Sequence, residues 1–270
     1  MGLFSSNYNR PGPGIYKNQP KKKPFFLFWE IFFRKFWQLI QLNLLFCVPV
    51  IAVFALMVLL SGVTSLAALV NLPLILLFPF IGGLTMITRN YAREEHAFLL
   101  SDFMGAVKKN WAAFLANGIV SYVLYLILSI AITYYNSQIK ENSIFVVPFA
   151  LCVGIAFLFI AAQYYIPVMI ITFDLKISQI YKNALIFAII GLWRNLLLTV
   201  LLGLLIFVFY ILFQLMPLTI LIAVCLLLFL MFSFVMFLIN FVVYPLIDKT
   251  MIQPFQEKEG GNSEQSDFKD

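Results

Sequence analysis

The sequence predicts an all-α membrane protein, a bundle of helices that crosses the bilayer six times. Of its residues 63% are hydrophobic and only 11% are charged, whereas soluble domains contain about 45–50% apolar and about 25% charged residues. Several apolar runs reach the roughly 20 residues that a helix needs to cross a hydrocarbon core of about 30 Å. These runs are continuous, while the strands of a membrane barrel alternate in character over about 10 residues. Transmembrane helices are therefore expected rather than strands.

The six spans follow from the apolar runs. The break between the fifth and sixth is the least marked, because Pro217 is its single helix breaker. One helix over residues 195–244 would be about 75 Å long at 1.5 Å per residue, which is too long for one span, so two helices are expected. The predicted spans are 39–60, 66–88, 111–134, 144–173, 196–216 and 218–244.

The stretch ahead of the first span predicts an amphipathic helix. At 100° per residue its polar side chains share one narrow stripe, and aromatic residues cover the rest. Such a helix would lie in the headgroup plane, with the preceding lysines near anionic lipid. Alternatively, the aromatics form the cytoplasmic belt of a long first span. The polar stripe is Glu30, Arg34, Gln38 and Gln41, and the interfacial anchors are Phe28, Trp29, Phe32, Phe36 and Trp37.

A similar unit is expected before each later outward span. After the second span, Ser101 and Asp102 can cap a short helix whose apolar face is Phe103, Val107, Trp111 and Phe114. After the fourth, Ser178 can cap a helix that Gly191 ends.

These units predict three repeats, each an interfacial helix followed by a hairpin of two spans. Each returning span carries a proline near its cytoplasmic half, and each outward span opens with a tryptophan. The repeats cover approximately 25–90, 98–175 and 177–248, which together form the membrane domain 25–248. A disordered basic tail, 1–24, precedes it, and the tail 249–270 is expected to be disordered from about 256.

The charges predict the orientation of the chain. Every Lys and Arg except Lys140 falls in a segment on one side of the predicted spans, and positive residues collect on the cytoplasmic side. We therefore expect a multi-pass protein of the cell membrane with both termini in the cytoplasm. The net charge of +6 then indicates topology and contact with anionic lipid, and nucleic acid is not an expected partner.

Several motifs give the chain a resemblance to a known family. They are FRKFWQL at 33–39, FPFIGG at 78–83, SDF at 101–103 with KNW at 109–111, and YKNA at 181–184. Over roughly 25–249 the chain resembles the YesL family of Gram-positive bacteria, which is biochemically uncharacterised. The resemblance implies a genomic setting beside carbohydrate-uptake transporter components and sugar-degrading enzymes. It implies no catalytic residue.

The residues themselves offer little for catalysis. His96 is the only histidine and lacks the second histidine of a zinc-binding helix. Cys47, Cys152 and Cys225 lie inside apolar runs with no Cys-x-x-Cys spacing, so each is expected to behave as a small hydrophobic residue. Gly82 and Gly83, like Gly203, are expected to permit close helix packing. We expect no enzyme activity, no metal and no cofactor.

Amide side chains are the main polar groups within or beside the spans. Coupled carriers usually keep an ionisable residue at mid-membrane depth, and these spans have none, which argues against active transport. The amides either bond across helices, for about 0.6 kcal/mol each, or line a path for a solute, with Asn43, Asn117 and Asn240 as its first candidates. The full set is Asn43, Asn71, Asn117, Gln163, Gln214 and Asn240.

The connection between the second and third spans carries a dense cluster of both charges. Such a balanced cluster suits docking of a protein partner by complementary charge, although charged residues occur on any solvated loop. The candidate docking residues are Arg89, Arg93, Glu94, Glu95, Lys108 and Lys109, with Asp102 beside them.

Two functional classes remain. The first is a non-catalytic accessory or regulatory component associated with carbohydrate uptake, with a transporter component as its partner; this rests on the resemblance. The second is an uncoupled channel or facilitator for a small solute, built around the axis that relates the hairpins. The sequence leaves the oligomeric state open.

Overall fold

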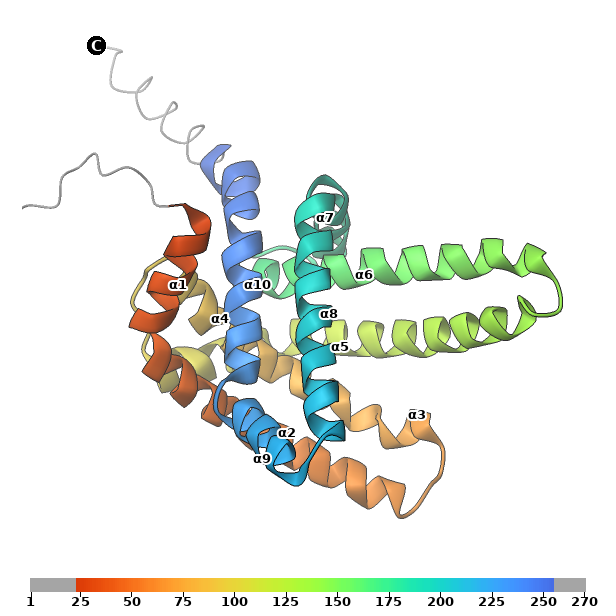
Figure 1. Cartoon of the computed structure of the whole chain (residues 1–270). Coiled ribbons are helices and arrows are strands. Elements are labelled where there is room, and N and C mark those ends of the chain that lie inside the picture. The colour runs from red at the N-terminus through yellow and green to blue at the C-terminus, as the bar shows by residue number, and fades with distance from the viewer. Residues whose placement is uncertain (1–22, 255–270) are drawn as a thin grey trace, which may run out of the picture.

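The computed structural model describes residues 23–254, and every regular element within them is helical (Figure 1). Predictions for 1–22 and 255–270, including most of both tails, lie outside the described residues. The helices are α1 (Pro24–Arg34), α2 (Phe36–Ser61), α3 (Ala67–Val70), α4 (Phe78–Ala92), α5 (Leu99–Gln138), α6 (Val146–Thr172), α7 (Ile177–Ile190), α8 (Leu192–Gln214), α9 (Pro217–Leu226) and α10 (Phe232–Ile247). The 3₁₀ segments η1 (Leu72–Leu77) and η2 (Ser143–Phe145) and the π-helical turns η3 (Leu227–Met231) and η4 (Asp248–Ile252) join or extend them.

Six helical stretches of the described chain are long and apolar enough to cross a membrane, so the predicted fold class is confirmed. The fifth and sixth are separate helices, because the chain turns at Leu215 and Met216 and Pro217 begins α9. The sixth stretch contains both π-helical turns and continues past its predicted end. The stretches are Phe36–Ser61, Ala67–Ala92, Leu99–Gln138, Ser143–Thr172, Leu192–Gln214 and Pro217–Ile252.

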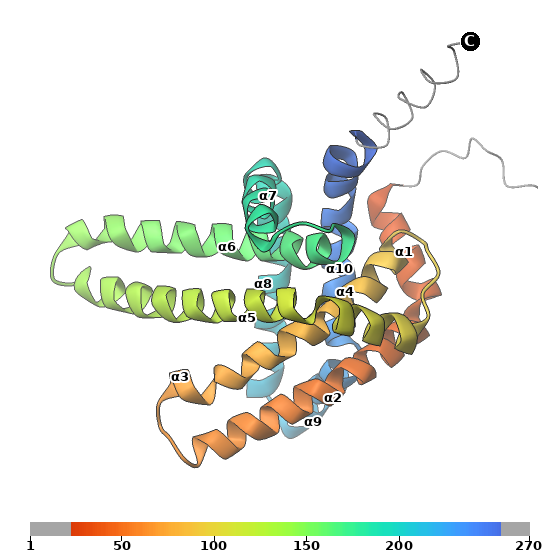
Figure 2. The ribbon, with the colours of Figure 1, turned by 180° about the vertical axis from the view of Figure 1, so that it is seen from behind.

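The helices pack together at one end and spread apart at the other (Figures 1 and 2). Buried residues occur in α5 only between Phe103 and Tyr122, and in α6 only between Ala161 and Ile170. We call the region that holds these buried segments, with α1, α4, α7 and α10, the packed end. The outer parts of α5 and α6, of α2 with α3, and of α8 are the arms. The arms expose apolar side chains, as expected of surfaces solvated by lipid chains.

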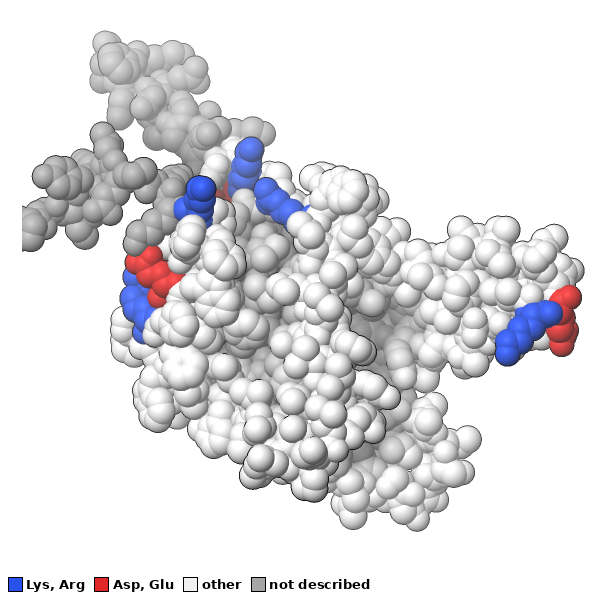
Figure 3. Space-filling view, in the orientation of Figure 1, with Lys and Arg blue, Asp and Glu red and all other residues white. Residues whose placement is uncertain are grey.

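Charged side chains are segregated on the surface (Figure 3). They appear at the packed end and at the tip of the α5–α6 arm, with an uncharged surface between them. The turn at that tip contains Lys140 and Glu141. An uncharged band between two charged zones is the pattern that a bilayer requires. Which zone faces the cytoplasm stays a prediction.

Helix α1 packs on the protein. The chain bends at Lys35, which separates α1 from α2. Phe28 is only 7% exposed, and its ring lies 5.1 Å from that of Phe237 in α10, centroid to centroid; Phe32 is also buried and meets Phe234. The prediction that these two anchor the helix in the headgroups is therefore wrong, because α10 offers an aromatic surface that sequence cannot distinguish from lipid. Trp29, Phe36 and Trp37 are exposed, and their role as anchors stays a prediction.

The two later units differ from the expectation. The second is no separate helix, because α5 runs unbroken for 40 residues; Asp102 does accept a hydrogen bond from the backbone N–H of Phe98 at its start (2.8 Å). The third is the separate helix α7, which ends before Gly191 as predicted. Its first turn is closed by the Gln179 side chain on the Lys176 backbone N–H (3.1 Å), and Ser178 is not the cap.

Two glycines of α4 allow close contact with α5 at the packed end. A Cβ at Gly83 would lie 2.6 Å from the ring of Phe103, and one at Gly82 would lie 2.8 Å from the ring of Phe114. Both rings belong to α5, so these glycines let α5 lie against α4 as predicted. Gly203 differs from the prediction, since a Cβ there would meet no atom within 4 Å.

Candidate functional site

Asn43 joins α2 to the irregular part of the sixth span. Its buried Nδ2 donates to the carbonyl oxygens of Leu227 (2.9 Å) and Leu228 (2.7 Å), and its Oδ1 accepts from the backbone N–H of Ser233 (2.9 Å). The π-helical turn η3 interrupts the regular bonding pattern here, and polar backbone groups cannot be satisfied by hydrocarbon. Asn43 therefore holds the irregular turn in place.

Asn117 and Gln163 form a reciprocal amide pair between α5 and α6. Asn117 Nδ2 donates to Gln163 Oε1 (3.1 Å), and Gln163 Nε2 donates to Asn117 Oδ1 (3.2 Å). The Tyr181 hydroxyl of α7 also donates to Asn117 Oδ1. Burial raises the pKa of Tyr181 to about 12, so its hydroxyl keeps its proton at neutral pH. Two predicted residues thus meet, and α7 adds a third that the sequence did not indicate.

Asn240 links α10 to α4. Its Nδ2 donates to Thr88 Oγ1 (2.7 Å) and to the carbonyl oxygen of Met236 (3.0 Å). Gln214 lies apart from the other amides, since it is the exposed last residue of α8. The amides that lie in the packed end therefore bond between helices at separate places and do not converge on one polar site.

Arg89 is the only charged side chain that is buried within residues 23–254. Its Nη1 donates to Thr172 Oγ1 (3.0 Å) and its Nη2 to Asn90 Oδ1 (3.0 Å). Helices α4 and α6 end at Ala92 and Thr172, and the partial negative charge of helix C-termini stabilises a cation there. At 7% exposure Arg89 is shielded from a docking partner, so this part of the docking prediction is wrong. The cause is that α4 continues one turn beyond the predicted end of the span.

Three other charged residues of the connection between the second and third spans contact side chains of this same protein. Glu94 forms an ion pair with Arg34 of α1, and Arg93 pairs with Glu95 (2.6 Å). The Arg93 guanidinium also lies over the Tyr244 ring of α10, 5.0 Å from its centroid. These contacts tie α1, α4 and α10 together at the packed end, whereas Lys108 and Lys109 are exposed on α5.

Glu94 has an unusual backbone. Its φ of 58° lies in the left-handed region, which costs a non-glycine residue about 1–2 kcal/mol. Its N–H donates to the Tyr91 carbonyl (3.0 Å) and that of Glu95 to the Asn90 carbonyl (2.8 Å), the bonding pattern of a Schellman helix end. Glycine is usual at this position, and glutamate here places a carboxylate against Arg34.

Asn195 and Thr199 were missed as polar contacts of the packed end. Asn195 Oδ1 accepts from the Tyr165 hydroxyl (2.8 Å), its Nδ2 donates to the Ala188 carbonyl (3.0 Å), and Thr199 Oγ1 bonds the Tyr164 hydroxyl (2.9 Å). Thr199 lies six residues after a tryptophan, and Asn43 and Asn117 stand at the same spacing in the earlier units. This shared spacing of six residues after a tryptophan is the sequence pattern that could have indicated Thr199.

Residues 39–132 match the model of a family described as "Protein of unknown function, DUF624". The chain is thus similar to this family over its first three spans. No curated protein and no solved structure matches it. The match is consistent with the resemblance of the sequence motifs, and the description assigns no activity. The matched residues include Asn43, Arg89 and Asn117.

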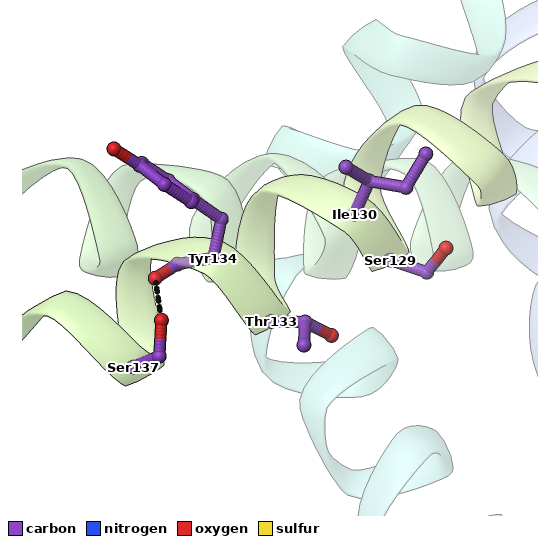
Figure 4. Close-up of a pocket in the computed structure, with 5 residues that line it drawn as sticks. All are labelled: Ser129, Ile130, Thr133, Tyr134 and Ser137. Atoms are coloured by element: carbon purple, nitrogen blue, oxygen red, sulfur yellow. Dashed lines mark hydrogen bonds between the residues drawn. The ribbon is translucent and has the colours of Figure 1, made fainter.

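A polar stripe lies in the α5–α6 arm, and of its three residues only Ser129 falls within the matched region. Ser129, Thr133 and Ser137 follow one another at every fourth residue of α5 and line a shallow pocket of about 460 Å³ with Ile130 and Tyr134. Ser129 and Thr133 point to the same side of the helix, and the Ser137 hydroxyl donates to the carbonyl oxygen of Tyr134 (2.7 Å; Figure 4). We call Ser129, Thr133 and Ser137 the hydroxyl stripe.

Proposed function

We propose that the chain is a non-catalytic accessory component of a membrane complex, and that a transmembrane helix of its partner packs on the hydroxyl stripe. The resemblance of the sequence motifs suggests that the partner is a component of a carbohydrate transporter. We also propose that the packed end lies on the cytoplasmic side of the membrane.

The observation that carries this proposal is the row of hydroxyl groups in an arm, of which Thr133 and Ser137 are exposed and Ser129 is half-buried. Ser and Thr side chains in a membrane are usually found between helices, where they hydrogen-bond across the interface. Here Ser129 and Ser137 donate to carbonyl groups of their own helix (3.0 and 2.7 Å), which makes the stripe stable in lipid while its oxygen atoms can still accept. Small side chains four residues apart also allow close approach of a second helix.

The buried amides favour this function over a solute path. Asn43, Asn117, Gln163 and Asn240 bond to other helices of the chain. None of them lines the pocket on the hydroxyl stripe or the apolar groove between α8 and the rest of the bundle. Their hydrogen-bonding capacity is therefore used largely in packing. A facilitator would instead need such groups to face a shared aqueous path.

The test is recovery of the partner from the native membrane with a tagged full-length chain. The variant Ser129→Leu/Thr133→Leu/Ser137→Leu should weaken partner binding about twentyfold, because three interhelical bonds contribute about 0.6 kcal/mol each. The control Val123→Leu/Ile127→Leu alters exposed apolar residues elsewhere on the same arm and should leave recovery unchanged. Equal recovery from both variants would remove the stripe as the docking site. Recovery of a carbohydrate transporter component would support the suggested partner.

The facilitator remains the second candidate because the hydroxyl stripe could contact a polar solute. Purified chain in vesicles would then speed the entry of a small neutral sugar, and the stripe variant would abolish that entry. If the sugar enters no faster than it enters empty vesicles, the facilitator is excluded and only the accessory function remains.

A further inference from the structure

A groove of about 490 Å³ opens between α8 and the rest of the bundle. It is bounded by α2, α4, η3 and α10 on one side and by α8 on the other, and all of its lining residues are apolar. It is separate from the hydroxyl stripe, which lies on α5. The groove is therefore a second feature that the proposed function does not use.

Its size requires an occupant. Protein interiors are packed nearly as densely as organic crystals and leave few voids larger than a water molecule. Water is a poor occupant, because an apolar cavity offers it no hydrogen-bond partners. In a membrane, the material that can fill an apolar groove is a lipid chain or another helix.

The length of the groove corresponds to one leaflet. Its wall on α8 extends from Leu202 to Phe213, which is about 16 Å at 1.5 Å per residue. Half of a hydrocarbon core of about 30 Å is about 15 Å. The groove thus occupies the half of the membrane that contains the turn between α8 and α9.

The volume selects a lipid chain over a helix. A helix with its side chains is about 10–12 Å wide, so 16 Å of helix would fill about 1,300–1,800 Å³. All the empty space of the groove, its open mouth included, is about 1,090 Å³, which is too little for a helix. We propose that it binds one acyl chain of a membrane lipid from this leaflet. Leu227 and Met231 of η3 line the groove, so the bound chain packs directly on the irregular turn that Asn43 holds.

The experiment uses the full chain in vesicles of phosphatidylglycerol and phosphatidylethanolamine with a trace of phosphatidylcholine that carries a diazirine in its acyl chain. Light links the acyl chain covalently to the protein residues that it touches, and mass spectrometry locates these adducts. We expect the adducts on α8 to be concentrated on the groove side, at Leu202, Leu205 and Phe209. Adducts spread over α8 in proportion to exposure would overturn the proposal.

Two matched variants sharpen the test. Leu205 lines the groove, whereas Leu204 is exposed on the other side of α8. Leu205→Trp fills the groove and should lower the groove adducts about fivefold or more, while Leu204→Trp should leave them unchanged. Leu205→Phe should give an intermediate loss and serves where the tryptophan variant does not fold. Equal labelling of all four proteins would contradict an acyl chain as the occupant.

Discussion

The packed end and the arms are built from the same long apolar helices, yet one is a protein interior and the other a lipid-facing surface. Helix α5 contains both: Phe103, Phe114 and Asn117 are buried near its start, and its outer part after Tyr122 has no buried residue. The difference lies in the small and polar residues. Gly82 and Gly83 admit neighbouring rings, and Asn43, Asn117, Asn195 and Asn240 bond across helices, all within the packed end.

The comparison shows where a membrane helix bundle obtains its stability. Lipid chains are as apolar as leucine, so burying leucine against a second helix gains little from the hydrophobic effect. Close packing at glycines and hydrogen bonds between amides provide the difference. The arms lack these contacts and are correspondingly free to meet lipid or another protein.

The largest expected effect is at Gly83. Gly83→Ala places a Cβ against the buried ring of Phe103 and should lower the free energy of unfolding in mixed micelles by about 3 kcal/mol. Gly203→Ala, which meets no atom within 4 Å, should raise it by up to about 1 kcal/mol, because alanine favours helix more than glycine. Similar values for the two variants would mean that α4 and α5 are not in close contact.

The next effect is at Asn43. Asn43→Leu removes the partners of the Leu227 and Leu228 carbonyls and of the Ser233 N–H, and should cost about 2 kcal/mol of unfolding free energy. Gln214→Leu, at an exposed position of an arm, should change it by less than about 0.5 kcal/mol. If Asn43 lined a path and held no structure, both variants would be equally stable.

A smaller effect is expected at Phe28. Phe28→Ala loses packing on α10, but lipid replaces much of the apolar contact, so the cost should be about 1–2 kcal/mol. Phe25 is 68% exposed on the same helix, and Phe25→Ala is the control, with no measurable change in unfolding free energy. If the two variants lowered the free energy of unfolding equally, α1 would not pack on α10 and would lie in the headgroup plane, as the sequence predicted.

The smallest effect concerns Arg34 and Glu94. Both side chains are about half exposed, so a double-mutant cycle with Arg34→Gln and Glu94→Gln should give a coupling of about 0.2–1 kcal/mol. High salt should weaken it. A coupling of zero at low salt would show that the pair does not attach α1 to α4.

Sequence patterns could predict the number of spans and their approximate positions. A bilayer requires apolar helices of a certain length, and few polar residues interrupt the apolar runs of this chain. They also found Asn43, Asn117, Gln163 and Asn240 as polar groups of the spans. They could not say which apolar face meets protein, since Phe28, which packs on α10, and Trp37, which is exposed, have the same sequence pattern. Arg89 was misplaced by one helical turn, which was enough to move it from a loop into the bundle.

The central claim is that the packed end is a protein interior and that the α5–α6 arm is surrounded by lipid. Single spin labels along α5 from Ala106 to Asn136, in the purified chain in vesicles, measure access to oxygen, which dissolves in hydrocarbon. The structure predicts a helical period with deep minima at Ala106, Phe114 and Asn117, followed by higher access beyond Tyr122, where the residues are half-buried or exposed and none is buried. Minima that continue through Ser129 and Thr133 would contradict the claim, because the hydroxyl stripe would then be covered by the chain or its own copies.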